Sequence, residues 1–194
     1  MKIFFDTEFT GLHKNTTLVS IGLISEDKRT FYAELSDFDW KQVHADESKF
    51  LLNNVVNNLV CRKNESEVQY ISGYRIGTKQ EVAMMLKNWF KQFESVELVS
   101  DVCHYDMVLF IDLFGGAFDI PKNICAACYD INQDIARKYK ITMVEAFDKS
   151  REDILYQNYK EGKIQGDKHN ALYDAKVIRE LYQILNNINF DERK

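Results

Sequence analysis

The sequence predicts a mixed α/β domain with a five-stranded sheet flanked by helices, and three observations support this fold class. Three short apolar segments lie within the first 34 residues and are joined by short connections. Two further short apolar segments come later, and each follows a stretch with helical spacing. The chain ends on a long stretch with helical spacing. Consecutive strands with short connections indicate an antiparallel meander, and strands that alternate with helices indicate an α/β sheet.

The first half of the chain supplies the meander. The strands are predicted at 2–9, 17–24 and 29–34, where β-branched and apolar residues predominate, and a tight turn at Glu26-Asp27-Lys28 joins the last two. Residues 46–59 have helical spacing that four asparagines weaken. Residues 61–77 are polar, so we expect an exposed connection there.

The second half alternates helices with strands. Thr78 and Glu81 predict a capping box at the start of an amphipathic helix that extends to Phe93. The remaining elements are predicted as a strand at 96–99, a helix at 105–114 that ends at Gly115-Gly116, a strand at 123–127, weaker helices at 130–139 and 150–159, and a last helix at 171–185. The 194 residues show no repeat or linker, so we expect one domain, 1–194.

Composition narrows the class of protein. A net charge of −5 argues against a broad basic surface for nucleic acid, but it leaves a nucleic-acid enzyme open, because carboxylates that bind Mg²⁺ carry part of that charge. We see no signal peptide and no apolar run of 18 residues, so we expect a soluble, cytoplasmic protein. Four unevenly spaced cysteines fit a reducing compartment. Cys125 and Cys128 lack two further ligands for zinc, so we expect buried or half-buried thiols.

Two carboxylates, Asp6 and Glu8, lie two residues apart in the first predicted strand. Side chains at i and i+2 of a strand point to the same face, about 7 Å apart. Like charges that close resist ionisation, and a divalent cation with oxygen ligands relieves the repulsion. The pair therefore predicts a metal site, with the polar face of an edge strand as the alternative.

A third carboxylate, Asp106, lies where a short strand gives way to a helix, and α/β sheets hold many of their sites at such positions. We expect Asp106 to turn toward the first strand; the alternative is a first-turn aspartate that stabilises the helix dipole. Asp101 and Asp112 are expected to face solvent.

A fourth segment contains His169 and Asp174. Five residues correspond to about 140° of helical rotation, so both side chains could not face one spot from a single helix. We therefore expect His169 on the preceding loop, Asn170 as the N-cap and Asp174 facing inward. A histidine beside an inward carboxylate suits a general base next to a metal; an ordinary surface histidine is the alternative.

In this order the residues resemble the DEDDh family of 3′–5′ exonucleases, which have an RNase H-like fold. Phe5-Asp6-Thr7-Glu8-Phe9, Tyr105-Asp106 and the segment from His169 to Ala175 are similar to the three motifs of the family, and the resemblance spans nearly the whole chain. It is strongest to the small bacterial and phage exoribonuclease-like branch. One departure is Val102, where many relatives have an asparagine that helps to position substrate; His104 is a candidate replacement.

The resemblance implies phosphodiester hydrolysis with two Mg²⁺ or Mn²⁺ ions. Asp6 would bridge both ions, Glu8 and Asp174 would complete one ligand shell, and Asp106 would hold the second ion. His169 would take a proton from the attacking water, because an ordinary histidine pKa of about 6.5 suits neutral pH.

The implied partner is the 3′ end of single-stranded RNA or DNA, with single-stranded RNA or a 3′ overhang as the favoured substrate and nucleoside 5′-monophosphates as products. Substrate contacts are predicted for Thr7, Phe9 and Tyr105; Tyr173 is a further aromatic candidate, and core or wall packing is the alternative for the aromatic rings. Candidate phosphate contacts are Lys168, Lys176 and Arg179. A homodimer is also possible. The alternative functions are a 3′–5′ exodeoxyribonuclease and a catalytically silent nucleic-acid-binding module.

Overall fold

A computed structural model describes residues 1–64, 67–68, 73–158 and 164–190. Within these residues, six strands form one sheet in the order β6-β3-β2-β1-β7-β8, and β4 and β5 pair separately. Neighbours among β1, β2 and β3 are antiparallel, whereas β6, β7 and β8 each join the sheet in parallel. The strands are β1 (Lys2–Phe9), β2 (Leu18–Ser25), β3 (Thr30–Leu35), β4 (Arg62–Asn64), β5 (Glu67–Val68), β6 (Arg75–Gly77), β7 (Val96–Ser100) and β8 (Ile124–Asp130). The predicted meander and mixed α/β class are confirmed.

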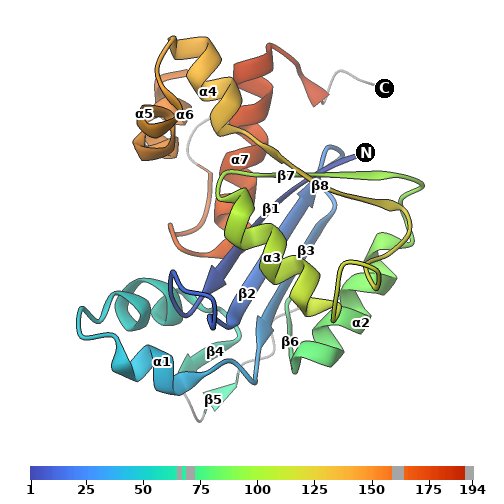
Figure 1. Ribbon diagram of the computed structural model, residues 1–194, viewed down its shortest axis with the longest axis vertical. Coiled ribbons are helices and arrows are strands. Elements are labelled where there is room, and N and C mark those ends of the chain that lie inside the picture. Colours follow the sequence, from blue (N-terminus) through green and yellow to red (C-terminus); the bar gives the residue numbers. More distant parts are fainter. Residues whose placement is uncertain (65–66, 69–72, 159–163, 191–194) are drawn as a thin grey trace.

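Helices cover both faces of this sheet (Figure 1). They are α1 (Trp40–Ala45), α2 (Lys79–Phe90), α3 (Cys103–Leu113), α4 (Asn132–Tyr139), α5 (Met143–Asp148), α6 (Arg151–Asn158) and α7 (Ala171–Asn186), with a π turn η1 (Leu51–Val55) and a 3₁₀ turn η2 (Val56–Asn58). None of the helices in the described ranges is long and apolar enough to cross a membrane.

Alternate side chains of β1 enter two separate cores. Phe5 packs on Phe110 of α3, with ring centroids 5.8 Å apart, whereas Phe4 packs on Tyr182 of α7, with centroids 5.4 Å apart. Because residues i and i+2 of a strand share a face, Asp6 lies on the same face as Phe4, under α7.

The capping box at the start of α2 is confirmed, since Thr78 accepts a hydrogen bond from the Glu81 backbone and donates its own N–H to the Glu81 carboxylate at 2.8 Å. The predicted connection at 61–77 contains a further sheet strand, β6, which adds a sixth strand to the five expected. The short helix α5 was not predicted. Its own capping box, Thr142 with Glu145, was the sequence signal for it.

The helix predicted at 46–59 is wrong in its bounds. A regular helix, α1, precedes that range, and the range itself contains only the π turn and the 3₁₀ turn. Polar side chains there bond to the backbone: Asp46 accepts from Leu51 N at 2.8 Å, and the amide groups of Asn54 and Asn58 donate to carbonyls four residues earlier. Such bonds offer the backbone an alternative to regular helical pairing.

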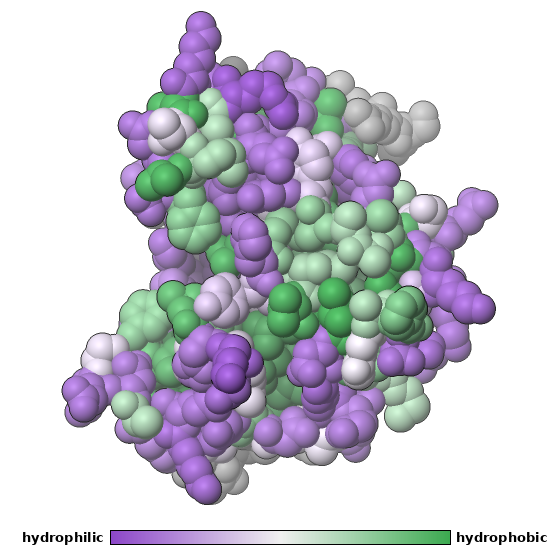
Figure 2. Space-filling model, viewed as in Figure 1, coloured by the Kyte–Doolittle hydropathy of each residue, from purple (hydrophilic) through white to green (hydrophobic). Residues whose placement is uncertain are grey.

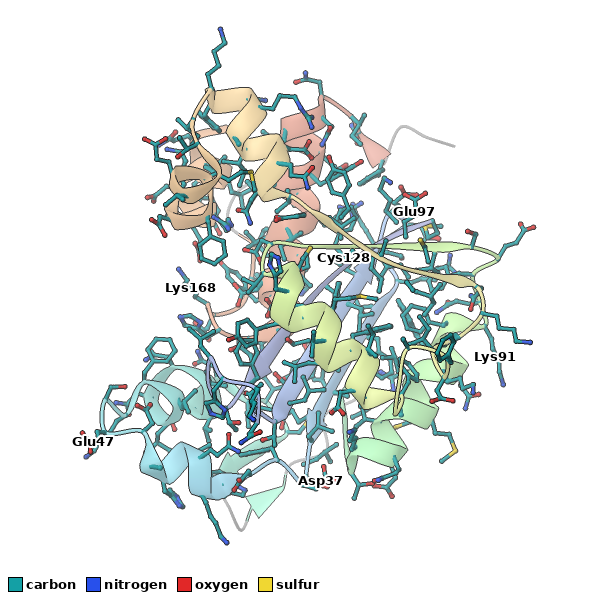
Figure 3. The ribbon with its side chains drawn as sticks, in the orientation of Figure 1. Asp37, Glu47, Lys91, Glu97, Cys128 and Lys168 are labelled. Carbon is teal, nitrogen blue, oxygen red and sulfur yellow. The ribbon has the colours of Figure 1, made fainter. Side chains whose placement is uncertain are left out.

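The expectation for the cysteine pair is half wrong, because Cys125 is exposed and only Cys128 is half-buried. Both lie on β8, where residues three apart face opposite sides of the strand, so the two thiols do not converge. Cys128 Sγ instead lies 2.7 Å from Cys103 Sγ, near the start of α3 (Figure 3).

Candidate active site

Asp6 and Glu8 lie in the C-terminal half of β1, and as whole residues they are only 9% and 8% exposed. Within the described residues, no group donates a hydrogen bond to either carboxylate. A buried carboxylate without a hydrogen-bond donor is costly, and a bound cation is one of the few arrangements that offsets the cost.

Asp106 lies in the first turn of α3 and is fully buried. One of its carboxylate oxygens accepts from Thr7 N at 3.2 Å and from Thr7 Oγ1 at 2.6 Å, and the other accepts from Ser100 Oγ. The Ser100 hydroxyl also accepts from Val102 N at 3.0 Å, which closes the turn between β7 and α3. The structure thus turns Asp106 toward β1, and it commits the Thr7 hydroxyl to orienting Asp106.

His169 lies on the loop before α7, and Asn170 is the N-cap, as the sequence indicated. The His169 backbone has φ 63° and donates its N–H to Asp174 Oδ2 at 2.8 Å. The His169 ring packs edge-on against Phe50, with centroids 5.1 Å apart. Asp174 therefore holds the loop that presents the histidine.

A glycine that we did not single out brings α7 to the site. Gly22 pairs with Asp6 across β1 and β2, and a Cβ added to it would lie 2.2 Å from Leu172 N and 2.3 Å from the Ala171 carbonyl carbon. The first turn of α7 therefore rests directly on β2, beside the β1 carboxylates. A glycine inside an apolar strand is the sequence signal for such a close approach.

The prediction that Asp101 faces solvent is wrong, whereas Asp112 is exposed, as predicted, and pairs with Lys79. The Asp101 side chain is 15% exposed and accepts from Arg151 Nε at 2.9 Å. The possible ligand atoms form two groups, and within each group all atoms lie within 4.8 Å of one another. The groups are Asp6 with Asp101 and Asp106, and Glu8 with His169 and Asp174.

Burial raises the pKa values of Asp6, Glu8 and Asp174 well above their usual range, and the neighbouring carboxylates, Asp101 among them, raise them further. Burial also raises the pKa of Asp106 to about 7, although its hydrogen bonds from Ser100 and Thr7 oppose the shift. Burial lowers the pKa of His169, and the nearby Lys168 lowers it further. The site thus combines carboxylates that repel one another with a histidine that favours its neutral, proton-accepting form.

The donor set fits a hard divalent cation. The groups offer carboxylate oxygens and one imidazole nitrogen, and Mg²⁺ and Mn²⁺ prefer oxygen ligands. Asp6 and Glu8, the two carboxylates to which no described residue donates a hydrogen bond, belong to different groups. The described residues therefore offer two places where a cation could be held, one at each group.

A cleft of about 890 Å³ opens above these residues. Its mouth lies at the left edge of Figure 2, between the region of α4–α6 and that of α1 and η1, and Lys168 lies there in Figure 3. Three aromatic side chains line it from different elements: Phe9, Phe50 and Phe147. Tyr105 stacks on Phe9 with centroids 5.2 Å apart and does not itself line the cleft, so its predicted substrate contact stays a prediction.

Several lesser expectations are wrong. Arg179 is 1% exposed and donates to the carbonyls of Ser25 and Glu26, so it cannot meet a phosphate. Tyr173 is 7% exposed and packs within the α7 core, which is the alternative that the sequence left open for its ring. Of the remaining candidates for substrate contact, Lys168 lines the cleft, as does Val102. Lys176 and His104 are not among the described residues that line it.

The sequence matches the family model described as a 3′–5′ exoribonuclease Rv2179c-like domain over residues 1–185. Comparison with curated protein sequences found no match. Three solved structures, each with a TM-score of 0.58 and each matched over 97% of this chain, are similar at 12–14% identity. They are a full-length 3′-exonuclease (13% identity, 83% of its chain), a 3′-exonuclease recognising the 3′ end of a histone mRNA stem-loop (12%, 83%), and the nuclease domain of 3′hExo, a DEDDh family member, bound to rAMP (14%, 93%).

Proposed function

The chain belongs to the family of Rv2179c-like 3′–5′ exoribonuclease domains, with an RNase H-like fold, and from this premise we propose that it is a metal-dependent enzyme that removes nucleoside 5′-monophosphates from the 3′ end of single-stranded RNA or of a 3′ overhang. The observation that carries the proposal is the pair of buried carboxylates, Asp6 and Glu8, which lie at the floor of the cleft and accept no hydrogen bond from the part of the chain that the structure describes.

In this proposal Asp6, Glu8, Asp106 and Asp174 would hold two Mg²⁺ or Mn²⁺ ions, with Glu8 and Asp174 at one ion, Asp106 at the other and Asp6 shared between them. When bound, such ions supply positive charge to the scissile phosphate and lower the pKa of a coordinated water. Asp106 Oδ1 accepts two bonds from Thr7, whereas Oδ2 accepts one, from Ser100, and keeps a lone pair for a cation; the three bonds fix the direction of that lone pair.

His169 is the general base. Its lowered pKa keeps the imidazole neutral at neutral pH, so that a ring nitrogen can accept the proton of the attacking water. The backbone bond to Asp174 and the edge contact with Phe50 restrict the orientation of the ring. The same aspartate thus supports both the metal site and the base.

The cleft favours an unpaired 3′ end. Phe9, Phe50 and Phe147 offer apolar faces on which unpaired bases can stack, whereas a base within a duplex is already stacked on its neighbours. Lys168 at the mouth forms an ion pair with Glu152 at 3.6 Å, and its side chain is 59% exposed, so a phosphate can compete for it. Of the structural neighbours, one is described as recognising the 3′ end of a histone mRNA stem-loop and one as bound to rAMP, which favours RNA over DNA here.

The test is a comparison of 5′-labelled single-stranded RNA and DNA of one sequence, with Mn²⁺ or Mg²⁺ and with EDTA. We expect a ladder of shortened RNA, nucleoside 5′-monophosphate products, faster loss of RNA than of DNA, and no reaction in EDTA. Asp6→Ala should abolish the ladder, whereas Asp112→Ala, which changes an exposed carboxylate on α3, should not. Full activity of Asp6→Ala would refute the metal assignment, and faster loss of DNA would reassign the substrate.

A further inference from the structure

Asp101 belongs to the carboxylate cluster, although the family resemblance gives its position no role. It lies between β7 and α3, and one of its oxygens lies within 4.8 Å of ligand atoms from Asp6 and Asp106. Asp101 also lines the cleft. Three carboxylates so close together repel one another, so their proximity requires a compensating positive charge.

Arg151 of α6 holds Asp101 in this position. Its Nε donates to Asp101 Oδ2 at 2.9 Å, its Nη1 donates to the Ala146 and Phe147 carbonyls at 3.1 Å, and its Nη2 donates to Asn132 Oδ1 at 2.7 Å. Asn132 in turn donates to the Asp101 carbonyl at 2.7 Å. The backbone and one carboxylate oxygen of Asp101 are thus fixed from two helices, and within the described residues Oδ1 accepts no bond.

A second, independent observation points to a cation at this place. Asp6 is more than nine-tenths buried, accepts no hydrogen bond within the described ranges, and directs its carboxylate into the same cluster. Three carboxylates and one guanidinium leave two negative charges, which one divalent cation neutralises. Oxygen-only ligand sets of this kind suit Mg²⁺ and Mn²⁺.

We propose that Asp101 is a further ligand, direct or through one water, of the cation held by Asp6 and Asp106, and that Arg151 is the residue that positions it. The inference rests on the proposed metal dependence of the enzyme. If the ion pair between Arg151 and Asp101 served only to attach α6 to the sheet, the Asp101 carboxylate would not need to lie beside the carboxylates of Asp6 and Asp106. The Arg151 bonds orient Asp101 as outer partners orient metal ligands elsewhere.

The test is titration of the chelator-treated full chain with Mn²⁺, followed by calorimetry and by the loss of free Mn²⁺ signal in electron paramagnetic resonance. Asp101→Asn removes the charge but keeps an acceptor for Arg151, so the fold should persist; we expect at least a tenfold weaker affinity for one Mn²⁺. Asp112→Asn should bind as the unmodified chain does. Arg151→Lys should weaken binding less than Asp101→Asn.

Unchanged Mn²⁺ affinity and stoichiometry in Asp101→Asn would overturn the inference while leaving the proposed function intact. Absence of Mn²⁺ binding by the unmodified chain, or its persistence in Asp6→Asn, would instead refute the proposed function. Unfolding curves in EDTA show whether each variant is folded. If Asp101→Asn is unfolded, folded Arg151→Lys decides the matter: weaker Mn²⁺ binding supports the inference, and unchanged binding contradicts it.

Discussion

Without a metal ion, the stability of the folded chain should fall as the pH rises from 5 toward 8. Burial raises the pKa values of Asp6, Glu8 and Asp174 well above their usual range and that of Asp106 to about 7. A carboxylate whose pKa is higher in the folded state binds its proton more tightly there. Its stabilising contribution is therefore complete below the unfolded pKa and is lost as the pH rises through the folded value.

Asp106 sets the scale of the effect. Between pH 5 and its folded pKa of about 7 lie about two units, and at about 1.4 kcal/mol per unit this is a loss of about 3 kcal/mol. For a domain of this length such a loss lowers the melting temperature by roughly 10 °C. His169 acts in the opposite direction, since its lowered pKa makes its contribution grow up to about pH 6.5, and it offsets part of the fall.

Differential scanning calorimetry in EDTA from pH 5 to pH 8 measures this fall, and repetition with saturating Mg²⁺ or Mn²⁺ should remove most of it. Asp6→Asn takes one charge out of the cluster, so its melting temperature should depend less steeply on pH. A melting temperature in EDTA that stays flat or rises between pH 5 and pH 8 would show that these carboxylates are not destabilising, and the electrostatic reasoning would be wrong.

Three further variants test how the site is built. His169→Ala should lose most turnover and keep its Mn²⁺ affinity in calorimetric titration; loss of that affinity would make His169 a ligand or a structural residue. Gly22→Ala should force α7 away from β2, lower the free energy of unfolding in denaturant by about 1–3 kcal/mol and weaken Mn²⁺ binding. The control is Gly116→Ala, whose added Cβ would meet only a side chain at 3.3 Å, so its stability and its Mn²⁺ binding should be unchanged. Asn170→Ala removes the N-cap of α7, so it should lower the free energy of unfolding in denaturant by about 1 kcal/mol and lower kcat more than it raises KM. An unchanged kcat would show that the cap does not contribute to catalysis.

The placement of the motif residues was predictable because it follows from local periodicity. Strand alternation placed Asp6 and Glu8 on one face, and helical rotation together with the N-cap Asn170 placed His169 on a loop. The same rotation explains an expectation that failed. Val177 and Ile178, three and four residues after Asp174, line the cleft with it, whereas Arg179 lies five residues on and turns into the core.

What local sequence could not show depends on contacts between distant segments. The prediction that Asp101 faces solvent failed because its partner, Arg151, lies fifty residues later in the chain. No periodicity in the sequence links the end of a strand to a helix so far away. The close approach of α7 to Gly22 likewise exists only once the sheet has formed. The preference for RNA over DNA and the homodimer stay predictions, because neither the fold nor the carboxylates depend on them.

The carboxylates of the candidate site bear on substrate binding. Five carboxylates meet at the floor of the cleft, and the formal net charge of the whole chain is also −5. Without metal, this floor repels a phosphate backbone to the extent that it is ionised, and two of the cations that line the cleft are already paired, Arg151 with Asp101 and Lys168 with Glu152. Two divalent cations would bring the chain close to neutral and reverse the sign of the charge that faces the scissile phosphate. Metal binding in this protein is therefore expected to control whether RNA enters the cleft as well as whether it is cleaved there.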